Sequence, residues 1–268
     1  MTNQRPLIMG ILNVTPDSFS GDGQLEHAPV QAAARLAAAG AQIIDIGAES
    51  TRPNATALSA DDEWARLAPV LAAVARQPWR HQVQLSVDTR HAATAARSLA
   101  LGVDIINDVT SLAAPELLRL LGAQTCDVVV MHALSVPVDP KLTLPAGCDV
   151  VEELLRWKAA ATARAQAHGI AAERLVIDPG IGFVKTAEQS LALMLRAGEL
   201  VASGGRWLYG HSRKSFMKLF TSAEAAARDD LTLAFSAQLA HAGVHCLRVH
   251  EVARHAALLA KLQPGVRP

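Results

Sequence analysis

Polar side chains that could bind one small molecule follow short apolar runs along the whole chain. Acidic or amide groups end three of these runs and cationic groups follow the last two; they are Asp88, Asn107 and Asp178, then Lys214, Arg248 and His250. A carboxylate accepts two parallel hydrogen bonds from a guanidine-like edge, and an asparagine beside it both donates and accepts. The acidic and amide trio therefore suits a flat, amide-rich heterocycle such as a purine, a guanidinium or a pterin. The cations suit an anionic group bound to it.

The apolar runs predict the elements that would position these side chains. There are eight: LIMGILNV (7–14), AQIIDIGAE (41–49), VQLSVDT (83–89), VDIINDV (103–109), CDVVVMHA (126–133), RLVIDPG (174–180), RWLYGHS (206–212) and HCLRVH (245–250). Continuous apolar runs are typical of strands buried on both faces of a parallel sheet. Between them lie Ala- and Leu-rich stretches with helical spacing, including 29–40, 116–123 and 149–169. Gly40, Gly122 and Gly169 stand at or near the ends of these stretches, where a glycine commonly follows a helix.

Eight strand–helix alternations predict a (β/α)8 TIM barrel, with residues 1–268 as a single domain. An open doubly wound sheet shows the same alternation, but the count of eight and the lack of G-x-G-x-x-G after the first run favour the barrel. In a barrel, all strand ends meet at one face. Polar residues at eight consecutive ends therefore predict a shared pocket, although a single one is often only a cap or turn residue. Residues 212–215 also look like a helix start that attracts an anion.

Composition narrows the classes of protein that the chain can belong to. Half of the residues are apolar, and 25 Lys and Arg balance 25 Asp and Glu. This balance offers no electrostatic surface for nucleic acid or an anionic membrane. The three cysteines are scattered without metal-ligand spacing, and no apolar stretch is long enough to span a membrane or act as a signal peptide. We therefore expect a cytoplasmic protein with no nucleic-acid or membrane partner.

Several motifs, in order along the chain, resemble those of the dihydropteroate synthase family. They are ILNVTPDSFS (11–20), IDIGAESTRPNA (44–55), SVDT (86–89), INDV (106–109), MH (131–132), DPGIGF-x-KT (178–186), G-x-SRKSF (210–216) and RVH (248–250). That family joins 6-hydroxymethyl-7,8-dihydropterin pyrophosphate to 4-aminobenzoate and releases pyrophosphate. The resemblance implies this transferase activity in folate biosynthesis, Mg²⁺ as cofactor and a homodimer. Sulfonamides, which mimic 4-aminobenzoate, inhibit this family.

The resemblance also implies a role for individual residues. The pterin-binding set is Asp88, Asn107, Met131, Asp178 and Lys214, of which Asp88, Asp178 and Lys214 are the expected catalytic groups. The pyrophosphate-binding set is Asn13, Arg248 and His250, with Asn13 also a ligand of Mg²⁺. The 4-aminobenzoate-binding set is Phe19, Thr51, Arg52, Pro53, Phe183 and Ser215. The implied reaction cleaves the C–O bond ahead of attack by the arylamine, because the dihydropterin ring delocalises the developing cation.

Departures from the family pattern leave two other readings open. The first loop reads Gly21-Asp22 where the family places the acidic residue first, and Ala48, Asn54 and Val184 replace common glycines. A pterin-binding paralogue without synthase activity is compatible with such changes. A methyltetrahydrofolate-type methyltransferase barrel shares the fold and a similar Asp/Asn trio, but it has no pyrophosphate to hold. The intact NVTP, SRKSF and RVH elements argue against it.

Overall fold

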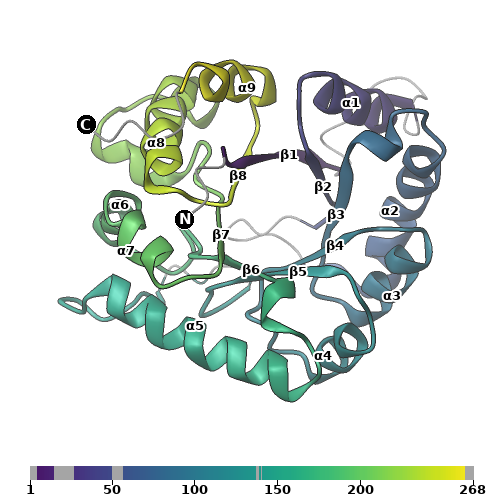
Figure 1. Cartoon of the computed structure of the whole chain (residues 1–268), viewed down its shortest axis with the longest axis horizontal. Helices are drawn as coiled ribbons and strands as arrows, with labels where there is room; N and C mark the ends of the chain where they lie inside the picture. Colours follow the sequence, from purple (N-terminus) through teal and green to yellow (C-terminus); the bar gives the residue numbers. More distant parts are fainter. Residues whose placement is uncertain (1–4, 15–26, 50–56, 137–138, 140, 263–268) are drawn as a thin grey trace.

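Eight parallel strands close into a barrel in the order of the chain. The computed structural model describes residues 5–14, 27–49, 57–136, 139 and 141–262. The strands are β1 Leu7–Asn13, β2 Ile43–Gly47, β3 Gln84–Asp88, β4 Ile105–Asp108, β5 Asp127–Met131, β6 Leu175–Asp178, β7 Arg206–Tyr209 and β8 Cys246–Val249. Pairing of β1 with β8 closes the ring, and Figure 1 shows the helices surrounding it. The predicted (β/α)8 barrel is confirmed.

Helices follow the strands as predicted, with local capping that sets their starts. The α-helices are α1 His27–Ala38, α2 Ala60–Ala75, α3 Ala92–Ala100, α4 Pro115–Gly122, α5 Val150–Ala167, α6 Ala187–Leu195, α7 Ala197–Ala202, α8 Asp229–Ala242 and α9 Val252–Lys261. Short 3₁₀ helices are η2 Arg80–Gln82, η3 Ala172–Arg174, η4 Ser215–Leu219 and η5 Ala225–Arg228. The Asp149 side chain accepts from the first backbone N–H groups of α5, and Thr186 forms a capping box with Gln189 at α6.

Two of the expected local features turn out differently. The helix expected from residue 212 is the five-residue 3₁₀ helix η4, which begins only at Ser215. Gly122 was expected to follow a helix, but it is the last residue of α4. A Cβ atom there would lie 1.9 Å from the carbonyl oxygen of His168. Glycine is therefore required at this position because the backbone of α4 touches the segment that follows α5.

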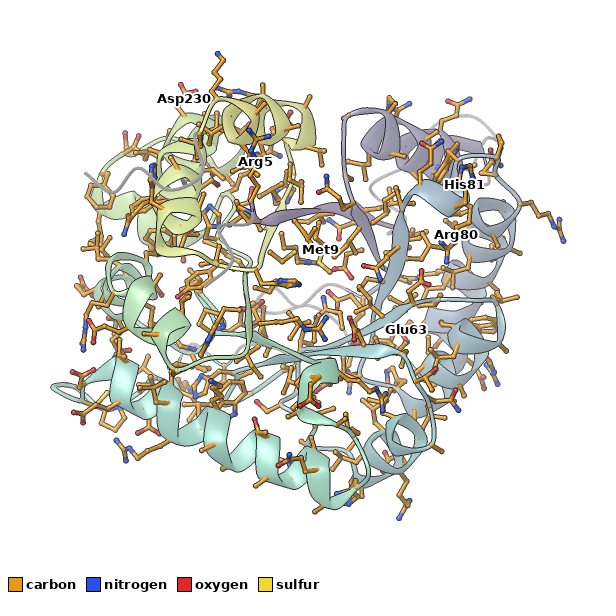
Figure 2. The ribbon with its side chains drawn as sticks, viewed as in Figure 1. Arg5, Met9, Glu63, Arg80, His81 and Asp230 are labelled. Carbon is orange, nitrogen blue, oxygen red and sulfur yellow. The ribbon has the colours of Figure 1, made fainter. Side chains whose placement is uncertain are left out.

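The barrel interior is built in layers that separate an apolar base from a polar mouth. The apolar layer consists of Met9, Ile43, Ile105, Val129, Val176, Leu208 and Cys246, and Figure 2 shows Met9 inside the ring of strands. Inward-facing side chains recur every second residue of a strand. Two residues further along the strands come Asp45, Asn107, Met131, Asp178 and Arg248. This period places four polar side chains and that of Met131 above the apolar layer, toward the carboxyl ends of the strands.

Candidate active site

A hydrogen-bonded cluster of acids, amide and guanidinium occupies the barrel interior. The Nε of Arg248 donates to Oδ2 of Asp45 at 2.6 Å, and its Nη2 donates to Oδ2 of Asp88 at 3.1 Å. The Nδ2 of Asn107 donates to the same Asp45 oxygen at 3.0 Å. Four strands, β2, β3, β4 and β8, thus contribute to one network. Asp45 joins the predicted residues Asn107 and Arg248, and Arg248 in turn joins Asp88.

Sequence reasoning did not include Asp45, which is fully buried. The signal was available, because Asp45 interrupts the apolar run IIDIG at a position that faces inward once the strand is in a barrel. Polar residues at strand ends form the predicted site. Asp45 lies one inward position before the end of its strand.

Two acids at the carboxyl ends of the strands, Asp88 of this cluster and Asp178 of β6, have raised pKa values. Burial, and then the neighbouring charge of Asp45, raises the pKa of Asp88 to about 7, against the opposing effect of Arg248. Burial also raises the pKa of Asp178, while a 2.7 Å hydrogen bond from the backbone N–H of Gly180 and the charge of Lys214 lower it. Both carboxyl groups therefore need donors or cations nearby to remain ionised, which a ligand rich in N–H groups would supply.

The segment after β6 is folded around a buried lysine. The Nζ of Lys185 donates to the carbonyl oxygens of Gly180 and Phe183, both at 3.1 Å, and lies 2.8 Å from Nδ1 of His132. Burial lowers the pKa of Lys185 to about 7 and that of His132 to about 3. Gly180 has a φ of 67°, and a Cβ there would lie 2.1 Å from the carbonyl oxygen of His132. Lys185 lies in the motif DPGIGF-x-KT (178–186), but the motif alone predicts no role for it.

Residues predicted for two different substrates adjoin one another beside this segment. Met131 and Phe183 share a small apolar cluster with Val109. The Nζ of Lys214 lies 4.3 Å from the centre of the Phe183 ring, a cation–π geometry. Gly182 has a φ of 78° and lies against the side chain of Lys214. The predicted pterin contacts Met131 and Lys214 are thus next to the predicted arylamine contact Phe183. Ser215 is exposed at the start of η4.

The segments after β7 and β8 are tied together next to the cluster. The Oγ of Ser212 lies 2.9 Å from Nδ1 of His250. Burial, with the charges of Arg213 and Arg248, lowers the pKa of His250 to about 4, so its ring is neutral at pH 7. Arg213 donates from Nε and Nη2 to Asp229 at 2.8 and 2.9 Å, and from Nη2 to Glu251 at 2.8 Å.

The rim near β1 and β2 is described only in part. Asn13 is exposed at the end of β1 and pairs with Gly47. Phe19, Thr51, Arg52 and Pro53 lie outside the described residues. Glu49 accepts a hydrogen bond from the backbone N–H of Leu58 at 3.0 Å. It also accepts two from the Arg90 guanidinium, each at 3.0 Å. Within the described ranges, no three or more His, Cys, Asp or Glu side chains form a metal-ligand group.

Comparison with known proteins identifies the family. The model of the family described as "Pterin binding enzyme" matches residues 9–250. A dihydropteroate synthase from Neisseria meningitidis serogroup C is 40% identical over 255 residues, covering 92% of this chain and 88% of that protein. This chain belongs to the dihydropteroate synthase family.

Two further members of the dihydropteroate synthase family illustrate its range. A probable bifunctional folylpolyglutamate synthase/dihydropteroate synthase from Haloferax volcanii is 40% identical over 258 residues. The match covers 95% of this chain but only 30% of that longer protein. The crystal structure of the Xanthomonas albilineans dihydropteroate synthase with 4-aminobenzoic acid superposes with a TM-score of 0.88 at 36% identity, covering 97% of this chain and 93% of that one. The resemblance inferred from the sequence motifs is confirmed.

Proposed function

We propose that this protein is a transferase of folate biosynthesis that condenses 6-hydroxymethyl-7,8-dihydropterin pyrophosphate with 4-aminobenzoate, forming 7,8-dihydropteroate and pyrophosphate. The observation that carries the proposal is the cluster in which Asp88, Asn107 and Arg248 meet inside the barrel, in a chain of the dihydropteroate synthase family. Residues from strands far apart in the sequence gather at the mouth where barrel enzymes bind their substrates.

The pterin ring is assigned to the carboxylates and the amide. Asp88 and Asp178 accept from the N–H groups of the amino-pyrimidine edge, and Asn107 adds a further hydrogen bond. Met131 packs against the ring and Lys214 bonds its carbonyl group. The raised pKa values of Asp88 and Asp178 support this assignment, because donors from the ring would favour the ionised acids.

The pyrophosphate is assigned to the rim beside β1 and β8. His250 is a neutral donor, because Nδ1 can accept from Ser212 and leave the proton on Nε2. Arg248 uses two N–H groups for Asp45 and Asp88, and a guanidinium offers more to the leaving group. Asn13 presents one amide side chain at the exposed strand end, with no acidic cluster beside it in the described ranges. A single amide oxygen suits Mg²⁺, which keeps water and substrate phosphates as its main ligands. When bound, the ion would neutralise charge on the phosphates.

The reaction we propose is substitution at the methylene carbon of the pterin. The C–O bond to pyrophosphate breaks first, and the leaving group takes the electron pair. Asp88 and Asp178 stabilise the resulting cation electrostatically. The neutral amine of 4-aminobenzoate then forms the C–N bond and loses its proton afterwards, so no strong base is required. Lys214 orients the ring throughout.

The arylamine site is assigned to Phe183 and Ser215, together with Phe19, Thr51, Arg52 and Pro53. Phe183 supports this placement, since it adjoins Met131 and Lys214 of the pterin set. A ring bound there would lie beside the pterin methylene. Sulfonamides should compete with 4-aminobenzoate for the same position.

The homodimer and the cytoplasmic location belong to this proposal as well. Leu195 at the end of α6 and Leu219 and Phe220 around η4 are exposed, and α6 packs against η4. A second copy of the chain would bury these large apolar side chains.

Two features bear on the location. In the described parts of the chain, no helix combines the length and apolar character that a membrane span requires. All three cysteines, Cys126, Cys148 and Cys246, are free thiols, which suits a reducing compartment.

Pyrophosphate release tests the proposed reaction. With dihydropterin pyrophosphate and Mg²⁺, we expect release that depends on 4-aminobenzoate. Pterin binding without release would indicate a non-catalytic paralogue, and transfer from a methyltetrahydrofolate without any use of the diphosphate would indicate a methyltransferase. Lys214→Ala should lower kcat/KM by about 100-fold or more, as expected for a group that orients the reacting ring. Lys218→Ala, an exposed lysine on η4, is the matched control and should turn over normally.

A further inference from the structure

Asp45 has the contacts of a residue that organises others rather than one that touches a substrate. Its side chain has no exposed surface. Its Oδ1 accepts from Oγ of Ser86 at 2.6 Å, and its Oδ2 accepts from Nδ2 of Asn107 at 3.0 Å and Nε of Arg248 at 2.6 Å. Three strands therefore send a donor to one carboxylate at the level just above the apolar layer.

A carboxylate in this position decides which way the Asn107 amide faces. An ionised carboxylate only accepts hydrogen bonds. The Asn107 side chain must therefore turn its NH₂ group toward Asp45, which leaves Oδ1 and the second amide proton for other partners. Without this constraint, packing alone would not fix the amide, because its two orientations differ little in shape.

The same carboxylate anchors Arg248. The guanidinium spans from Asp45 on β2 to Asp88 on β3, although Arg248 itself lies on β8. Removing one partner of a buried ion pair leaves the other charge uncompensated. Without Asp45, Arg248 would be free to form a closer two-point contact with Asp88, and this would occupy the acid that the pterin needs.

We propose that Asp45 is a positioning residue of the pterin site, which fixes the amide orientation of Asn107 and holds Arg248 so that Asp88 remains available to the ligand. This inference rests on the proposed function, because it takes Asp88 and Asn107 as pterin contacts. The groups are then in place before the ligand arrives, so that binding does not have to order them.

The test is Asp45→Asn, which keeps the shape of the side chain but removes its charge and adds a donor. We expect the affinity for 6-hydroxymethylpterin monophosphate, measured by calorimetry without the second substrate, to fall by about tenfold or more. KM for dihydropterin pyrophosphate should rise by a similar factor, whereas KM for 4-aminobenzoate should change little. A purely structural role for Asp45 would lower thermal stability without this split between the two substrates.

Asp127→Asn is the matched control. Asp127, like Asp45, pairs with an arginine of the barrel. It accepts two hydrogen bonds from Arg206, at 2.6 and 2.9 Å, but both residues begin their strands and so lie at the opposite end of the barrel. It should lose stability while its pterin affinity stays at the wild-type value. Equal losses of pterin affinity in the two variants, or wild-type affinity in a folded Asp45→Asn, would overturn the inference.

A milder variant keeps the inference testable if Asp45→Asn does not fold. Ser86→Ala removes the donor to Oδ1 and leaves the Asp45 charge in place. We expect a smaller loss of pterin affinity in the same direction, and an unchanged affinity would contradict the proposal. Assays of the wild-type protein distinguish failure of the proposed function from failure of this inference.

If the wild-type protein does not bind the pterin, both are refuted. If it turns over both substrates and the variants bind the pterin with the same affinity, only the inference is refuted.

Discussion

At the scale of single residues, Lys185 shows how a buried cation can hold irregular backbone. Lys185 is 8% exposed, and its Nζ bonds to two carbonyl oxygens of its own loop as well as to His132. Burial lowers the pKa of Lys185 to about 7, while the charge of Asp178 raises it. The lysine thus satisfies acceptors in a loop that leads from Asp178 to Phe183.

Replacing Lys185 by methionine should destabilise the fold by about 2–4 kcal/mol, because buried acceptors lose their donor. Thermal or urea unfolding measures this change. Lys158→Met is the matched control: its Nζ donates to the Ser203 and Gly204 carbonyl oxygens and to the Ser203 hydroxyl at the surface. Water can replace those bonds, so the control should lose less than about 1 kcal/mol. Equal losses in both lysine variants would show that burial of Lys185 is not the cause.

At the scale of elements, Arg213 joins three segments around the mouth of the barrel. It lies in the stretch between β7 and η4, and its guanidinium pairs with Asp229 at the start of α8 and with Glu251 before α9. Its φ of 61° is unusual for a residue with a side chain. Its neighbours along the chain are Ser212, which bonds to His250, and Lys214. The ion pairs therefore hold a strained turn that positions two predicted substrate contacts.

Arg213→Lys should weaken this junction, because an ammonium cannot reproduce the two-point contact with Asp229. We expect kcat/KM for dihydropterin pyrophosphate to fall by about tenfold, as small displacements of substrate-positioning groups are costly. Steady-state kinetics measures the effect. Arg196→Lys tests the specificity of the result, since Arg196 makes similar paired contacts with Asp149 and Glu199 at the exposed ends of α5 and α7. A comparable loss in Arg196→Lys would refute the junction's role.

At the scale of the whole molecule, the barrel mouth holds buried carboxyl groups, and burial favours their protonated, neutral form. Burial raises the pKa of Asp88, Asp108 and Asp178. Asp88 moves from 3.8 to about 7, so between these values the folded protein binds more protons than the unfolded chain. The stabilisation from this group is complete below about pH 4 and is lost as the pH rises through 7.

Asp88→Asn removes that pH dependence from the ligand-free protein. The free energy of unfolding of the variant, relative to the wild type, should increase between pH 4 and pH 8, by at most about 1.4 kcal/mol per pH unit. Urea unfolding at several pH values measures it. Asp149→Asn is the comparison, because backbone hydrogen bonds from α5 and the contact with Arg196 lower the pKa of Asp149. Its difference from the wild type should change only at more acidic pH. A constant difference for Asp88→Asn would contradict the prediction.

The sequence by itself determined the alternation of strands and helices, and through it the barrel and its functional face. Short apolar runs ending in polar residues are local patterns, and the geometry of parallel strands converts them into one mouth. Asp88, Asn107 and Asp178 could be selected because they stand at strand ends. The motifs also indicated the family, since they are short and contiguous.

Only the tertiary structure decided which of these groups are partners. Asp45 and Arg248 are 203 positions apart, and their contact depends on the pairing of β1 with both β2 and β8 as the ring closes. The motif resemblance predicts a pyrophosphate contact for Arg248 and no role for Asp45. The structure adds that the Arg248 guanidinium bonds to two acids, Asp45 and Asp88. Likewise, no local pattern distinguishes the buried Lys185 from an exposed lysine. Period and composition act within one strand, but partners across a barrel follow from register and closure, which every strand determines together.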